Sequence, residues 1–194
     1  MGVIMYPHNF FTLFPPFPRE NIVFVAMSFD SKFDKRWENL IIPAIRSTTY
    51  DGKPLKQCRV DISIASDSII TDILNGIGNC YLFFADLTSI GYLEEKGEER
   101  KAIRNGNVMY KVGIAQSTRL PEEVILFRSD DDPLLFDVAN VRVNYYNPDE
   151  NPLEAKTKVE KALSSAIKEI NLQKHFSVIR TVDALDITSV RSML

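Results

Sequence analysis

Asp86 ends an apolar run and is followed two positions later by Thr88, and this pair is the first feature of the sequence that could do chemistry. A carboxylate at the end of a buried strand costs free energy unless a polar partner or a ligand binds it. An aspartate in this position often caps the next helix or receives a ligand hydroxyl. From the residues alone, both interpretations stay open.

Asn107 and Lys111 form a second candidate, because residues four apart share one face of a helix. Gly113 and Ala115 are small, which would allow this helix to pack closely on a sheet. Such a helix is more often part of a core than part of a site, so these residues by themselves assign no function.

Patterns typical of metal or phosphate sites are missing from the sequence. His8 and His175 lie far apart, and neither has a cysteine or an acidic ligand pattern nearby. Neither GxxxxGK[ST] nor GxGxxG occurs. Residues 129–132 (SDDD) follow a predicted strand and could bind a cation, but a solvated turn is the better interpretation. We therefore expect no metal and no resident cofactor.

The elements that would position these residues alternate between strand and helix. Apolar runs predict strands at residues 22–27, 59–64, 80–85, 123–127 and 138–144. Periodic apolar stripes predict helices at residues 33–45, 69–77 and 107–117 and from Pro152 onward, with a bend at Pro43 and a cap at Ser66 or Asp67. In the first helix, Asp34, Lys35, Arg36 and Glu38 fall outside the apolar face. This alternation is typical of an α/β fold, a doubly wound parallel sheet of about five strands.

In an open parallel sheet, the site lies beyond the carboxyl ends of the strands, where the strand order reverses. Ser28 and Phe29 follow the first predicted strand, and Asp86 and Thr88 follow the third. The helix that starts at Asn107 opens at the same edge. The sequence therefore predicts a site made from these residues.

Around this sheet we expect three parts: a proline and aromatic arm at residues 1–20, the α/β domain at 21–150, and a C-terminal helix and tail at 151–194. Residues 88–105 are charged and irregular, which favours a solvated insertion, with a short helix or a lid as the lesser alternative. The last 20 residues have no strong apolar period. We expect the C-terminal region to mediate a homo-oligomer or to lead into an attached domain.

The composition and the length of the apolar runs argue against several classes of protein. The 23 basic and 26 acidic side chains give a net charge of −3, which argues against a nucleic-acid binder that relies on broad phosphate neutralisation. No apolar run is long enough to cross a bilayer, and the four prolines before Glu20 argue against a signal peptide. Cys58 and Cys80 lie in apolar patterns, as reduced thiols of a cytoplasmic protein do.

Several runs in a fixed order carry a resemblance to a known family. They are IVFVAMSFD, then Trp37 with IIPAI, then DSIITDIL, IGNCYLFFADLT and NGNVMYKVGIAQ. Together they resemble the nucleoside 2-deoxyribosyltransferase-like proteins, relatives of the TIR domains with a flavodoxin-like core, over residues 22–127. The resemblance implies cleavage of the N-glycosidic bond of a nucleoside, a nucleotide or NAD, by hydrolysis or transfer. NAD would then be a substrate, and a toxic role in bacterial defence is a further implication.

The resemblance also implies roles for individual residues. Asp86 would lie near the ligand as a catalytic group, Asp72 and Asn107 would hold the sugar, and Ser28 and Phe29 would line the base or phosphate pocket. Thr88 and Tyr110 complete the expected ligand-binding set.

One departure from the family pattern is serious. The family has N-V-x-Y-E-x-G-x-A, whereas this chain has Lys111 where the glutamate is expected. Bond cleavage places positive charge on the sugar carbon, which a carboxylate stabilises and a lysine ammonium repels. We therefore expect impaired cleavage, or alternatively a non-catalytic module that binds a nucleotide or signals by self-association.

Three accounts of Lys111 remain open. It is a natural loss of the catalytic group, or a change introduced into a protein whose active form is toxic to its host. In the third account, an acid from Glu94, Glu95, Glu98 or Glu99 serves instead.

Overall fold

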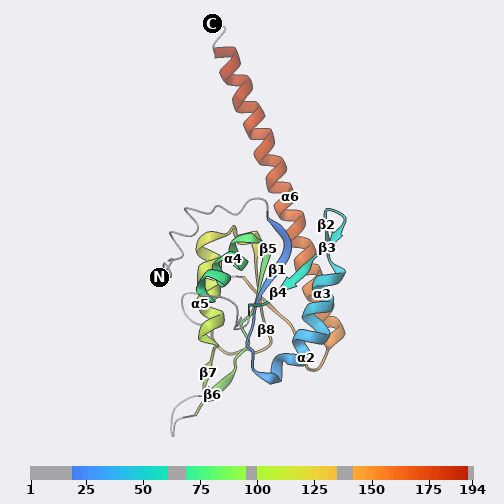
Figure 1. Ribbon diagram of the computed structural model, residues 1–194, viewed down its shortest axis with the longest axis vertical. Coiled ribbons are helices and arrows are strands. Elements are labelled where there is room, and N and C mark those ends of the chain that lie inside the picture. Colours follow the sequence, from blue (N-terminus) through green and yellow to red (C-terminus); the bar gives the residue numbers. More distant parts are fainter. Residues whose placement is uncertain (1–18, 61–68, 95–99, 135–141, 192–194) are drawn as a thin grey trace.

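A five-stranded parallel sheet lies at the centre of the computed structural model, which describes residues 19–60, 69–94, 100–134 and 142–191, with side chains up to Gln173 (Figure 1). The strand order is β4-β1-β5-β8-β9, and every neighbouring pair is parallel. The strands are β1 (Glu20–Ala26), β4 (Lys56–Cys58), β5 (Cys80–Asp86), β8 (Val124–Arg128) and β9 (Val143–Tyr145). The predicted α/β class with a parallel sheet is confirmed, and the arrangement is flavodoxin-like.

Helices cover both faces of the sheet (Figure 1). One face carries α3 (Ile42–Ser47) and α6 (Pro152–Arg191), and the other carries α4 (Ile69–Asn79) and α5 (Gly106–Thr118). Alternate residues of β1 serve the two cores, because successive strand side chains point to opposite faces. Val23 and Val25 pack on the α3 and α6 side, and Phe24 packs on the α4 and α5 side. All seven residues of β5 are buried, as expected for the middle of a parallel sheet.

The helix predicted at residues 33–45 is continuous but changes type along its length. It runs through η1 (Ser31–Phe33), α2 (Asp34–Arg36), a π-helical turn η2 (Trp37–Ile41) and α3. Pro43 has no backbone N–H and crowds the preceding turn, and the ladder widens there so that the Ile42 N–H bonds the Trp37 carbonyl. The predicted bend is therefore a π-helical turn. The predicted exposure of Arg36 is wrong, since this side chain is buried.

The glycine that allows a helix to pack closely on the sheet is Gly76, whereas we expected Gly113 to do so. A Cβ atom added to Gly76 in α4 would clash with the ring of Phe24, whereas one added to Gly113 in α5 would meet nothing within 4 Å. Gly113 is exposed, so its predicted packing role is wrong, while Ala115 is fully buried as expected.

Two short hairpins extend from the sheet. In the first, β2 (Thr49–Tyr50) pairs with β3 (Lys53–Pro54) through a turn in which Asp51 and Gly52 both have positive φ, as a two-residue hairpin turn requires. In the second, β6 (Gly91–Leu93) pairs with β7 (Lys101–Ile103). We expected an irregular insertion at residues 88–105, and this expectation is wrong for residues 91–93 and 101–103, which form paired strands.

Two predicted strands are displaced. The strand expected at 59–64 is found earlier, as β4, and residues 61–64 lie outside the described residues, as do the predicted caps Ser66 and Asp67. The strand expected at 138–144 is β9, and residues 138–141 lie outside the described part. A short 3-10 turn, η3 (Pro121–Glu123), precedes β8.

Helix α6 spans 40 residues, and its second half extends well beyond the sheet (Figure 1). The predicted apolar stripe of its first half is buried in the core, from Val159 and Leu163 to Ile170. The helix continues through the tail, where the sequence has no strong apolar period, to Arg191. Among the described residues, no helix combines the length and the apolar character that a membrane span requires.

Candidate functional site

The strand order reverses between β1 and β5. From β1 the chain passes to β4 on one side and then to β5 on the other, so the carboxyl ends of β1 and β5 flank the switch point of the sheet. Ligands of doubly wound proteins bind in the crevice at this point. The residues after these two strands are Ser28 with Phe29, and Thr88 next to the terminal Asp86.

Asp86 accepts hydrogen bonds on both carboxylate oxygens. Oδ2 accepts from Arg36 Nη1 at 2.9 Å and from the Tyr146 hydroxyl at 2.9 Å. Oδ1 accepts from the Thr88 amide at 3.0 Å and from the Thr88 hydroxyl at 2.5 Å. Arg36 also donates to Asp149 through Nη2 at 3.0 Å. These five residues, termed the carboxylate cluster below, satisfy the buried carboxylate without a ligand.

Contacts within the carboxylate cluster shift the pKa values of Arg36 and Tyr146. Burial lowers the pKa of Arg36 and the Asp86 carboxylate raises it, with a net pKa above the ordinary value. Burial and the same carboxylate raise the pKa of Tyr146 well above its usual range. Arg36 therefore stays a cation and Tyr146 a neutral hydrogen-bond donor across the physiological pH range.

Ser28 and Asn105 join the end of β1 to the start of α5. The Ser28 hydroxyl accepts from Asn105 Nδ2 at 3.3 Å and from the Asp30 amide at 3.2 Å. Asn105 caps α5, since its Oδ1 accepts from the amides of Asn107 and Val108. The contacts of Ser28 therefore fix the position of the residues after β1 relative to α5.

Phe29, shortly after the end of β1, lies near two cationic side chains. Its ring is 46% exposed, and the Arg59 guanidinium lies 3.8 Å from the ring centroid. Lys111 Nζ lies 5.9 Å from the same centroid, while the Lys111 side chain is buried. Arg59 also donates to the Ser28 carbonyl at 2.7 Å and lies 5.2 Å from the ring of Trp37. Phe29, Arg59, Lys111 and Trp37 are termed the cation–aromatic cluster.

The remaining predicted residues are more scattered. Asn107 and Tyr110 are exposed on α5, although Asn107 was expected to share a face with the buried Lys111. Asp72 lies on α4 and lines a separate cavity of about 480 Å³ with Cys58 and Asn79. The structure therefore does not bring Asp72 together with the Asp86 carboxylate.

Polar residues after β8 anchor the β6–β7 hairpin. Asp130 accepts from both terminal nitrogens of Arg104 at 2.7 Å and from the Ser89 amide at 2.8 Å. Asp132 accepts from the Tyr92 hydroxyl at 2.9 Å. The turn at 129–132, for which a cation site was the lesser alternative, is thus bound by protein donors. In the described ranges, no cluster of three or more histidine, cysteine, aspartate or glutamate side chains could hold a metal ion. Glu94 is exposed, and Glu95, Glu98 and Glu99 lie outside these ranges.

Arg36, Arg59 and Tyr146 were not expected at this edge. One signal was present, because an aspartate that ends a buried strand requires a partner. The partner could not be identified, since Arg36 and Tyr146 are 50 and 60 positions from Asp86.

Comparison of the sequence with profiles of known protein families and with curated proteins finds no match.

Proposed function

We propose that the chain binds a nucleotide at the carboxyl ends of β1 and β5 and leaves its N-glycosidic bond intact. The observation that carries this proposal is Lys111, a buried cation beside the exposed ring of Phe29 at the position where the resembled family has a carboxylate.

The cation–aromatic cluster matches the two chemical parts of a nucleotide. Arg59 and Lys111 supply positive charge for a phosphate, and arginine in particular binds phosphate oxygens through paired N–H groups. The exposed part of the Phe29 ring provides an apolar surface for a base or a ribose. A neutral nucleoside has no phosphate, so it would contact only the Phe29 ring.

Two observations disfavour catalysis by the family's route. The carboxylate expected at position 111 is absent, and the Asp86 carboxylate is already hydrogen-bonded within the protein. Lys111 replaces the group that would stabilise a positively charged sugar. Asp86 is 4% exposed and already accepts from Arg36, Tyr146 and Thr88, so a sugar hydroxyl would have to displace an internal partner. A binding role requires neither group to react.

The catalytic half of the proposal is tested by chromatography of NAD, AMP and adenosine after incubation with the chain and with Lys111→Glu. We expect intact compounds in every case. Release of free base or nicotinamide by the unaltered chain would contradict the proposal. Release by Lys111→Glu alone would identify the chain as a glycosidase silenced at this position, with folding of each protein checked by circular dichroism.

Self-association through the C-terminal region, a cytoplasmic location and a role in bacterial defence remain predictions. The extension of α6 beyond the sheet supplies helical surface for association or for a further domain (Figure 1). Sedimentation of the full chain at several concentrations tests the first of them.

A further inference from the structure

A cavity of about 1020 Å³ lies between α6 and the outer edge of the sheet. Its size is close to the upper limit of ordinary small-molecule sites. The edge is open there because β9 begins opposite Leu126, which leaves Val124 and Ile125 of β8 without a β9 partner. This cavity, termed the α6 groove, shares no lining residue with the carboxylate cluster or the cation–aromatic cluster.

The floor of the α6 groove is apolar. It is formed by Val124, Ile125 and Phe127 of β8 and by Ala162 and Ala166 of α6. The two alanines are four residues apart and therefore lie on one face of the helix. Because their side chains are small, they leave space above the strand that larger residues would fill.

Four cationic side chains line the α6 groove. Arg119 donates to the carbonyls of Ile77 and Tyr81, and Lys158 pairs with Glu154 at 3.1 Å. The other two lining cations are Arg142 and Lys161, and within the part of the chain that the structure describes neither forms an ion pair or a side-chain hydrogen bond.

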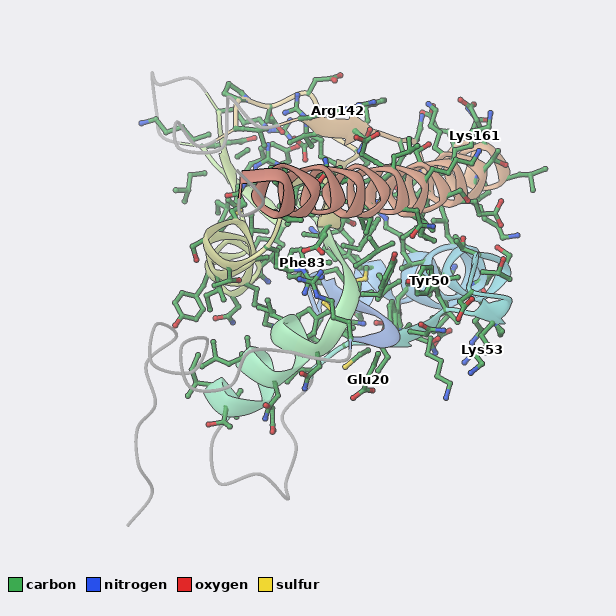
Figure 2. The ribbon with its side chains drawn as sticks, turned by 90° about the horizontal axis from the view of Figure 1, so that it is seen from above. Glu20, Tyr50, Lys53, Phe83, Arg142 and Lys161 are labelled. Atoms are coloured by element: carbon green, nitrogen blue, oxygen red, sulfur yellow. The ribbon has the colours of Figure 1, made fainter. Side chains whose placement is uncertain are left out.

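Arg142 and Lys161 lie on the same side of α6, the side away from Tyr50 and Lys53 (Figure 2). Two acidic side chains also line the groove, Glu122 and Glu169, and Glu122 accepts from Gln173. Because Lys158 pairs with Glu154 and Arg119 lies 3.4 Å from Glu123, the groove cations that have no ion pair among the described residues are Arg142 and Lys161.

We infer that the α6 groove binds an amphipathic organic anion, a small molecule whose apolar ring system lies on the floor and whose carboxylate or phosphate is held by Arg142 and Lys161. The apolar part of such a ligand would fill the space above the alanines. Its acid group would pair with the two cations that have no partner within the described chain. Sites of this kind combine an apolar lining with a few placed polar groups. This binding is independent of the proposed nucleotide site.

The test is isothermal titration calorimetry of the full chain with 1-naphthylacetate and with 1-naphthylacetamide, which has the same ring system and no charge. We expect one site for the anion and at least about tenfold weaker binding of the amide, because a hydrogen-bonded charge contributes on that scale. Equal affinity for the two compounds, or no binding of the anion, would overturn the inference.

Two variants locate the site. Arg142→Met with Lys161→Met should weaken binding of the anion about tenfold or more and leave the amide unchanged. Lys168→Met is the matched control, since Lys168 is exposed on α6 and does not line the groove, and it should bind as the unaltered chain does. Equal losses in the double variant and the control would contradict the assignment.

Ala162→Leu tests the floor separately, because the added side chain would occupy the space above β8. We expect it to weaken the anion and the amide alike. Unchanged affinity for both, in a variant with the thermal midpoint of the parent, would overturn the placement. If this variant does not fold, the charge variants decide the question alone.

Discussion

Asp86 and Arg36 are 50 positions apart in the sequence, yet their side chains form a buried ion pair with 2.9 Å between Oδ2 and Nη1. The pair fastens α2 to the end of β5, and Tyr146 and Asp149 add a third segment of chain to the same point. An aspartate that the sequence suggests for ligand contact therefore joins separate segments of the chain at the end of β5.

Removal of Arg36 should be strongly destabilising. Arg36→Met leaves the Asp86 carboxylate buried without its cation, and loss of one partner of a buried pair costs about 3–5 kcal/mol. Urea unfolding measures this free energy. Arg46→Met is the control, because Arg46 is exposed on α3 and should cost less than about 0.5 kcal/mol.

Coupling between the two residues separates a true ion pair from general loss of packing. In a double-mutant cycle with Asp86→Asn, the two changes should be non-additive by at least about 0.5 kcal/mol. Additive losses would mean that Arg36 acts through its contacts with the Phe33 and Tyr146 rings instead.

The β6–β7 hairpin should loosen at acid pH through Asp130. Burial raises the pKa of Asp130, but hydrogen bonds from Arg104 and the Ser89 amide outweigh this effect, and its net pKa is lowered. A lowered pKa in the folded state adds stability that is fully present above the unfolded value of about 3.9 and is lost as pH falls below it.

Comparison of unfolding free energies at pH 7 and pH 3 tests this dependence. Asp130→Asn should have a smaller acid loss than the unaltered chain, because it has no carboxylate to protonate at this position. Asp131→Asn, with an exposed side chain, should retain the parent's loss. An acid loss in Asp130→Asn as large as in the parent would rule out this role.

The two helix glycines should respond in opposite directions to alanine. Gly76→Ala places a Cβ atom against the buried ring of Phe24, which stacks on Phe83, and should cost about 1–3 kcal/mol. Gly113→Ala meets no neighbour and should gain about 0.5–1 kcal/mol from helix propensity. Thermal and urea unfolding check both, and a neutral Gly76→Ala would contradict the close contact between α4 and the sheet.

Strands that are buried on both faces could be predicted from the sequence, whereas the edge strand β4 could not be placed correctly. Strands β1, β5 and β8 were found from their apolar runs, because a strand buried on both faces must be apolar throughout. Strand β4 was missed at its true position, since Lys56 and Gln57 on this sheet edge are polar. An edge strand of three residues has no apolar run to detect.

The position of the candidate residues at the strand ends was predictable from the sequence, but their contacts were not. The strand-end rule leads to Ser28, Phe29 and Asp86 from the sequence alone. Arg36 was assigned to solvent because a charged residue among other charged residues has no local sign of burial. Arg36 is buried because it pairs with Asp86, which lies 50 positions away in the sequence, so its burial can be seen only in the folded chain.

Calorimetric titration of the chain and of Lys111→Met with ADP and with adenosine tests whether Lys111 helps to bind a phosphate. We expect ADP to bind the unaltered chain more tightly than adenosine, and Lys111→Met to weaken ADP about 10–100-fold while changing adenosine less than about threefold. Lys168→Met should match the parent. Equal binding of ADP and adenosine, or equal affinity of both proteins for ADP, would contradict a phosphate contact by Lys111.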